Sequence, residues 1–193
     1  IRDSYLLARE NLTDHLEKKD KQGKIRQRLL KIRAKKVILA TGALERPLIF
    51  NNNDRPGIML SSAIKKYADF YGVISGKKNV FFTNNDSAYE SAFCLHDKGI
   101  KVEAIIDIRE NSNSKIVKAV VEAGIKVYWS STIVDTTGYK RLNSVSVMKL
   151  SNDGLSVTGN KMNISCDCLG VAGGWTPAVH LFTQSGGCLL YTS

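Results

Sequence analysis

The chain has 193 residues, of which 43% are hydrophobic and 24% charged, and it holds only 3 prolines. This composition excludes disordered, collagen-like and low-complexity proteins, and the length suits one ordinary domain or two small ones. The cysteines are too few and too scattered for a disulfide-stapled secreted module; they are Cys94, Cys166, Cys168 and Cys188. Since no basic, apolar leader is visible, we expect no signal peptide.

Charge is concentrated near the start of the chain. The net charge is +10, and residues 1–36 contribute 12 Lys/Arg against 5 Asp/Glu. A basic stretch can mark a nucleic-acid footprint, but Tyr5 is the only aromatic residue before Phe50, so stacking platforms for bases are lacking. We therefore expect a solvated basic face and no nucleic-acid partner.

The longest stretch without Asp, Glu, Lys or Arg runs over residues 168–193. It contains several glycines, a proline, a histidine and a glutamine, whereas a membrane helix needs about 20 predominantly apolar residues. The sequence thus predicts buried chain and turns without a membrane span, and we expect a cytoplasmic protein.

The first third of the chain predicts two strands and a helix. Residues 26–36 alternate apolar and basic side chains, as in a strand with one face in water. Residues 37–40 are wholly apolar and precede Thr41-Gly42, which is typical of a strand buried on both faces. Residues 61–71 carry a helical apolar stripe that Ser61 or Ser62 can cap and that Gly72 can end.

A βαβαβ pattern follows between residues 80 and 129. Strands are expected at 80–82, 102–106 and 125–129, with helices at 86–98 and 114–123 between them. Strands alternating with helices of this length predict a parallel sheet with right-handed crossovers.

Residues 132–165 change character, because helical periodicity disappears and Asn152-Asp153-Gly154 signals a turn between two strands. We expect an antiparallel meander here. Residues 168–172 form one more apolar strand, which ends in Gly173-Gly174.

The segment VFFTNNDSAYESA (80–92) stands where a dinucleotide fold places its phosphate turn. Asp107, at the end of the next strand, has the spacing of an acid that takes a ribose hydroxyl. Of the expected G-x-G-x-x-G/A positions, however, only Ala88 fits; Thr83 and Asn85 replace the two glycines. Their Cβ atoms obstruct a diphosphate, so this half-site either binds weakly or is a structural relic.

Other candidate contacts are less specific. Thr41-Gly42 and Gly173-Gly174 both follow apolar strands and bring bare backbone to the edge of a sheet, although ordinary turns do the same. Cys166-Asp167-Cys168 is not a redox C-x-x-C, and zinc ligands at suitable spacing are lacking, so buried, inert thiols and no metal are expected. No catalytic acid, base or nucleophile can be named.

Three segments together resemble the alpha subunit of heterotetrameric sarcosine oxidase. They are RAKKVILATGALERPLIFNNNDRPGIML (33–60), VFFTNNDSAYESAF (80–93) and DCLGVAGGWTPAVHLFTQSGG (167–187). The resemblance implies an α/β, two-dinucleotide-binding-domain fold like that of the disulfide reductases. Residues 1–71 and 166–193 would be the incomplete first domain, and residues 77–165 an inserted second, Rossmann-like domain.

The resemblance also implies an activity. The family oxidises sarcosine to glycine, formaldehyde and hydrogen peroxide with FAD and FMN, mainly at the beta subunit, and with tetrahydrofolate bound by a region that this chain lacks. The alpha subunit holds NAD in its first fold. Matching positions are Thr176, Leu181 and Thr183, and Thr41 and Gly42 should border the same cleft. The partners would be beta, gamma and delta subunits, and this fragment alone should be inactive.

Three alternatives remain open at this point. The chain can belong to a related amine, opine or proline dehydrogenase alpha subunit. It can be a thioredoxin-reductase-like flavoenzyme, although the C-x-x-C is missing, or a binding module without enzymatic activity.

Overall fold

The computed structural model describes residues 5–187. The chain divides into two compact units, one formed by the residues up to Ala43 together with those from Pro177 onward, the other by Leu44–Thr176. Strands β3 (Ala43–Glu45) and β12 (Trp175–Pro177) pair with each other, and the division runs through both.

The smaller unit contains a β-hairpin. Strand β1 (Leu6–Asn11) pairs antiparallel with β2 (Gln27–Ile32), so that Leu6 lies opposite Ile32. The short helix α1 (Lys18–Lys21) lies in their connection, and α5 (His180–Gln184) belongs to the same unit. The strand expected within residues 26–36 is therefore confirmed, over residues 27–32.

The buried strand expected at residues 37–40 is wrong. These residues have no regular secondary structure; Val37 is half exposed and Ile38 almost fully so. An apolar run becomes a buried strand only when neighbouring strands pair with it, and no described residue does. A local apolar pattern does not supply the pairing partner that a strand needs.

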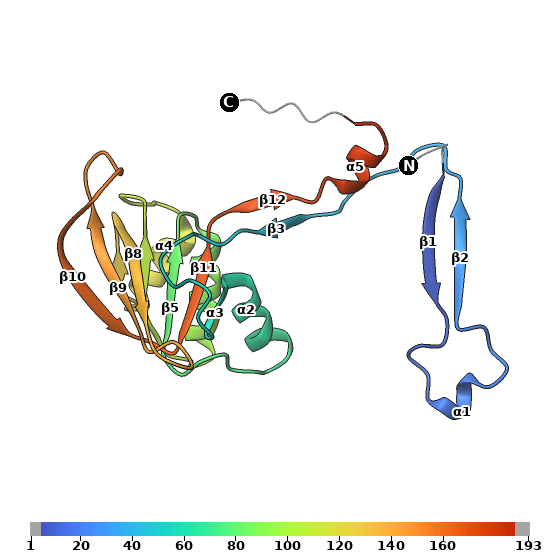
Figure 1. The fold of residues 1–193 in the computed structure, drawn as a ribbon, viewed down its shortest axis with the longest axis horizontal. Coiled ribbons are helices and arrows are strands. Elements are labelled where there is room, and N and C mark those ends of the chain that lie inside the picture. The colour runs from blue at the N-terminus through green and yellow to red at the C-terminus, as the bar shows by residue number, and fades with distance from the viewer. Residues whose placement is uncertain (1–4, 188–193) are drawn as a thin grey trace. The chain divides into compact units, whose positions relative to one another are not determined.

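The larger unit has three layers (Figure 1). Its central sheet has five parallel strands in the order β4-β11-β5-β6-β7. Helices cover one face and an antiparallel sheet of three strands, in the order β10-β9-β8, covers the other. The central strands are β4 (Ile58–Leu60), β5 (Asn79–Thr83), β6 (Val102–Asp107), β7 (Val127–Tyr128) and β11 (Cys168–Ala172).

The covering elements close to their expected positions are α3 (Ser87–Asp97), α4 (Lys115–Glu122), β8 (Ser131–Thr137), β9 (Ser144–Leu150) and β10 (Val157–Ser165). The α/β class, the parallel sheet and the meander are thereby confirmed. Ser114 caps α4 by accepting a hydrogen bond from the Val117 amide at 3.4 Å, as expected.

Two apolar cores lie on opposite faces of the central sheet, because successive side chains of a strand point to opposite sides. Phe81, with the helices, belongs to one core, and its neighbours Val80 and Phe82 belong to the other, against the meander. Each large side chain buried in this way stabilises the fold by roughly 1.5–3 kcal/mol. Every residue of both cores falls between Ile64 and Ala172.

Gly170 sets how closely helix α2 (Ser61–Phe70) lies on the sheet. A Cβ atom at this position would stand 2.6 Å from the Phe81 ring and 3.1 Å from Ile64 of α2. A side chain there would therefore push apart the strand and the helix.

The start of α2 differs from the expected capping. Neither Ser61 nor Ser62 caps the helix through its side chain; instead Oε2 of Glu45 accepts hydrogen bonds from the backbone N–H of Ser62, at 2.9 Å, and from its hydroxyl, at 2.5 Å. A carboxylate is the better group at a helix N-terminus because it also faces the positive end of the helix dipole. Gly72 follows the helix with φ +64°, as expected.

The predicted division at residues 71, 77 and 166 into two nucleotide-binding domains stays a prediction. The structure adds that α2, β4 and β11 share the sheet and helical layer of β5, β6 and β7.

Candidate functional site

The turn between β5 and α3 is filled by its own side chains. Oδ1 of Asn85 accepts hydrogen bonds from the backbone N–H of Ser87, at 3.0 Å, and from its hydroxyl, at 2.6 Å. The amides at the start of such a helix are the groups that bind a diphosphate in dinucleotide folds. Here the side-chain amide oxygen of Asn85 takes the place of a phosphate oxygen.

Thr83 completes this closure. Its side chain is buried, and its hydroxyl lies 2.8 Å from the Asn85 carbonyl and 3.1 Å from the Ala172 carbonyl, while the Asn85 amide donates to it at 3.0 Å. The turn is thereby tied to the end of β11. Besides the Cβ atoms, hydrogen bonds between neighbours now hold the turn shut, so the residues present do not fit a dinucleotide.

Asp107 is likewise inaccessible to a ligand. Its carboxylate is fully buried and accepts hydrogen bonds from the Tyr89 hydroxyl at 2.7 Å, the Arg109 backbone amide at 2.9 Å and the Arg109 guanidinium at 2.8 Å. A carboxylate with these partners has no free face for a ribose hydroxyl. The expectation raised by its spacing is therefore wrong, because the acid serves the interior of the domain.

Arg109 extends this network to the helix layer. Its guanidinium also lies 2.8 Å from Asp86, just before α3. Burial alone would raise the pKa of Asp86, but hydrogen bonds from Ser114 and Arg109 outweigh burial and hold that pKa below its ordinary value. Burial and the Asp107 carboxylate raise the pKa of Tyr89, whose ring stacks on Trp129 with centroids 6.0 Å apart. This edge of the sheet is a closed polar network.

The candidate residues of the first fold lie in exposed chain. The hydroxyl of Thr41 donates to the Ala178 carbonyl at 2.6 Å, and the Ala178 amide donates to the Gly42 carbonyl at 2.9 Å. Two segments far apart in the sequence are thus joined next to α5. Gly42 has φ +69°, and the space where its Cβ would stand is open. The backbone there remains accessible to a ligand.

The remaining candidates follow on this return segment. Thr183, on α5, is exposed and donates to the carbonyls of Val179 and His180 of its own helix. Leu181 is half-buried, and Thr176 is exposed on β12. A hydroxyl that donates to a helix carbonyl can still accept a hydrogen bond from a ligand.

The cysteines of the C-x-C segment are inert by their surroundings. Burial, aided by the neighbouring charge, raises the pKa of Cys166 to about 12 and that of Cys168 to about 12. The two thiols belong to different cores, on opposite faces of the sheet. Cys188 lies outside the described residues. Within residues 5–187 there is no cluster of three or more metal-ligating side chains.

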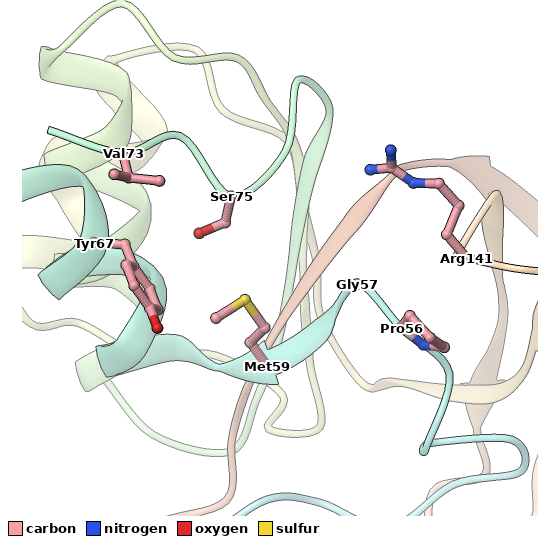
Figure 2. A pocket seen from close by; sticks show the side chains of 7 residues that line it. All are labelled: Pro56, Gly57, Met59, Tyr67, Val73, Ser75 and Arg141. Carbon is pink, nitrogen blue, oxygen red and sulfur yellow. The ribbon is translucent and has the colours of Figure 1, made fainter. Parts of the chain in front are cut away.

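A cavity of about 470 Å³ lies at the opposite, amino-terminal edge of the central sheet, and no sequence pattern pointed to it. Figure 2 shows Arg141 on one side, Tyr67 and Val73 on the other, and Met59 between them. Pro56, Gly57 and Ser75 complete its lining. These residues come from three separate segments, so only the folded chain brings them together. Within the described part of the chain, no helix is long and apolar enough to cross a membrane.

The sequence is similar to known sarcosine oxidase subunits, although no family model matches it. It is 41% identical over 190 residues to sarcosine oxidase subunit alpha of Corynebacterium sp. strain P-1, and 38% identical over 186 residues to that of strain U-96. The matches cover 97% and 96% of this chain. The chain spans only 19% of the length of either relative.

Solved structures of low sequence identity share the fold. Thioredoxin reductase of T. acidophilum matches with a TM-score of 0.60 at 17% identity, over 83% of this chain and 51% of its own. L-proline dehydrogenase of P. horikoshii matches with a TM-score of 0.52 at 21% identity, over 85% of this chain and 26% of its own. These likenesses confirm the disulfide-reductase-like fold. Over almost its whole length, the chain is similar to one segment of the sarcosine oxidase alpha subunits.

Proposed function

We propose that the chain is the dinucleotide-domain segment of an alpha subunit of a flavin-dependent sarcosine oxidase. The whole enzyme would act on a CH–NH bond, taking sarcosine, water and dioxygen to glycine, formaldehyde and hydrogen peroxide. The observation that carries this proposal is the 41% identity along 97% of the chain with a protein named for that subunit. Beta, gamma and delta subunits would complete the enzyme.

The closed turn after β5 supports a division of labour within the subunit. Because Asn85 and Thr83 occupy that turn, NAD would be held by the first fold, at Thr41, Gly42, Thr176, Leu181 and Thr183. FAD and FMN would lie mainly with the beta subunit, and tetrahydrofolate would bind a region outside this chain. The role of the described residues would be to bind and orient the dinucleotide and to dock partners.

The raised pKa values of Cys166 and Cys168 favour this proposal over a thioredoxin-reductase-like enzyme. A dithiol oxidoreductase needs a reactive thiolate at neutral pH, and a thiol with a pKa near 12 supplies almost none. The fold likeness to thioredoxin reductase therefore does not extend to the thiol chemistry.

The test uses the full-length subunit expressed with its neighbouring genes. Oxidation of sarcosine, proline and an opine is measured both as hydrogen peroxide formation and as reduction of an artificial electron acceptor. Sarcosine should be the preferred substrate; preference for proline or an opine would assign the chain to a related dehydrogenase, and the absence of amine oxidation would overturn the proposal.

NAD placement is tested by calorimetry on the same assembly. Thr176→Ala combined with Thr183→Ala should weaken NAD binding about tenfold, since each hydrogen bond contributes about 0.5–1.5 kcal/mol. Thr158→Ala, at an exposed threonine of β10, is the matched control. An unchanged affinity in the double variant would contradict the placement, as would crystals showing the cofactor against residues 84–88.

A further inference from the structure

An aromatic and aliphatic surface is exposed at the end of α2. It consists of Tyr67, Phe70, Tyr71, Val73 and Ile74, and we call it the α2 patch. Phe70 is 77% exposed and Ile74 60%. The rings contact one another, with centroids 5.9 Å apart for Tyr67 and Tyr71 and 4.9 Å for Phe70 and Tyr71. Contiguous large apolar side chains of this kind mark interaction surfaces.

The patch is held in place by the fold. Ile64 and Ala68, on the other face of α2, are buried in the helical core, and the Val73 amide donates to the Tyr67 carbonyl at 2.9 Å. The helix lies beside β4, the edge strand of the central sheet. A rigid, outward-facing group of aromatic residues is what a binding partner requires, because little order must be gained on association.

The cavity with Arg141 adjoins this patch, since Tyr67 and Val73 belong to both. In Figure 2 the guanidinium of Arg141 stands across the cavity from Tyr67, with the apolar side chain of Met59 between them. Tyr, Met and Arg are the residues enriched at the centres of protein interfaces.

Arg141 is only loosely paired. Its partner Asp167 lies 3.9 Å away, and that carboxylate accepts shorter hydrogen bonds from the backbone amides of Lys78, at 2.7 Å, and Lys77, at 3.1 Å. The Arg141 side chain is 62% exposed. The edge of the sheet thus offers an available cation beside apolar side chains.

We propose that the α2 patch and the Arg141 cavity form one docking site for a partner subunit. The docking segment of that partner would place an apolar side chain in the cavity and an Asp or Glu carboxylate on Arg141. Charge complementarity with the exposed Arg141 guanidinium argues for an acidic segment, and the relatives' designation as subunit alpha argues for a separate chain. The inference rests on the proposed function only in requiring a multi-subunit assembly, and not in the substrate oxidised.

Assembly is measured in the full-length subunit mixed with its partners, by native mass spectrometry and by titration of the dissociation constant. Phe70→Ser and Arg141→Glu should each weaken association at least tenfold, and association of the unmodified subunit should weaken as salt is raised. Leu155→Ser and Lys115→Glu, at exposed positions outside the site, are the matched controls and should leave association unchanged.

A photo-crosslinking phenylalanine analogue at position 70 identifies what covers the patch. A crosslink to an acidic segment of another subunit is the expected result. A crosslink to the subunit's own polypeptide, or a small organic anion retained in the cavity with no crosslink, would overturn the proposal. Unchanged association in both Phe70→Ser and Arg141→Glu would overturn it too, provided that thermal unfolding shows both variants folded.

Sarcosine oxidation in the same preparations separates the two proposals. An assembly that forms through this site but does not oxidise sarcosine contradicts the proposed function and leaves the docking site standing. An assembly that oxidises sarcosine but is insensitive to both substitutions supports the proposed function and contradicts the docking site.

Discussion

At the scale of single residues, Asn85 illustrates how one side chain changes what a fold can bind. A glycine at this position leaves the first amides of the following helix open to a ligand, whereas the Asn85 side-chain oxygen accepts a hydrogen bond from the Ser87 amide. The same interaction that excludes a diphosphate also satisfies the backbone amide of Ser87, the first residue of α3. Loss of binding and gain of stability thus have one physical cause.

Replacing Asn85 by Ala should destabilise the domain by about 1 kcal/mol, because the hydrogen bonds from the Ser87 amide and hydroxyl to its side chain are lost. Urea unfolding followed by circular dichroism measures the change. Asn160→Ala, at an exposed asparagine of β10, is the control. Equal stability of the two variants would show that the hydrogen bonds to Asn85 do not stabilise the start of α3.

The thiols offer a second test at this scale. Iodoacetamide at pH 8 should modify Cys94, which is partly exposed, at least a hundredfold faster than Cys166 and Cys168, whose pKa values of about 12 leave few thiolates. Mass spectrometry of peptides from the native protein resolves the sites. Comparable rates in the native protein, together with comparable rates after unfolding, would show that burial does not protect the two buried thiols.

At the scale of elements, Asp167 joins the start of β11 to the start of β5 through the amides of Lys77 and Lys78. Burial alone would raise the pKa of Asp167, but these hydrogen bonds outweigh burial and lower it below its ordinary value. A lowered pKa means that the interaction contributes stability above the unfolded-state value of about 4 and loses it as pH falls through the folded-state value.

Asp167→Asn should therefore be less stable than the unmodified protein at pH 6, and the difference should shrink as the pH falls below about 4. Urea unfolding at a series of pH values between 6 and 2 measures the difference in free energy. A difference that is constant across this range would show that the charge of Asp167 has no part in the contact.

Elements also show what sequence reasoning can reach. The strands and helices between residues 79 and 165 follow from periodicity and capping, because each carries its own signal, such as Ser114 before α4. The contact of Glu45 with the start of α2 could not be predicted from the sequence, since Glu45 lies 17 positions before Ser62. The strand predicted at residues 37–40 is absent because distant segments also decide pairing. The composition of these residues favours a strand, but no other segment within residues 5–187 pairs with them.

The candidate site likewise has features that the sequence predicts and features that depend on distant contacts. The obstruction by Thr83 and Asn85 was predictable, because a missing glycine is visible in the sequence. The burial of Asp107 by Tyr89 and Arg109 was not, since spacing alone cannot distinguish an acid that faces a ligand from one that faces the core. The contacts assigned to the first fold stay a prediction.

At the scale of the whole molecule, stability resides in one unit. Both cores consist of residues between 64 and 172, and the other unit contributes none of their members. A fragment of residues 44–176 should therefore fold alone, with a free energy of unfolding within about 1 kcal/mol of that of the longer chain, since apolar burial dominates stability.

Urea unfolding of the fragment and limited trypsin digestion of the longer chain check this prediction. Trypsin should cut first among the exposed basic residues between Lys18 and Lys36 and leave a resistant product. A fragment without near-ultraviolet circular dichroism or a cooperative transition would show that the smaller unit is required for folding.

The position of β11 between β4 and β5 has a consequence for biosynthesis. Both of its neighbours in the sheet are translated well before it. The sheet therefore stays incomplete between β4 and β5 until residues 168–172 have been synthesised. During that interval each neighbour presents unpaired backbone to any other nascent chain. Slower translation between β5 and β11 should therefore lengthen this interval and increase aggregation of the nascent protein.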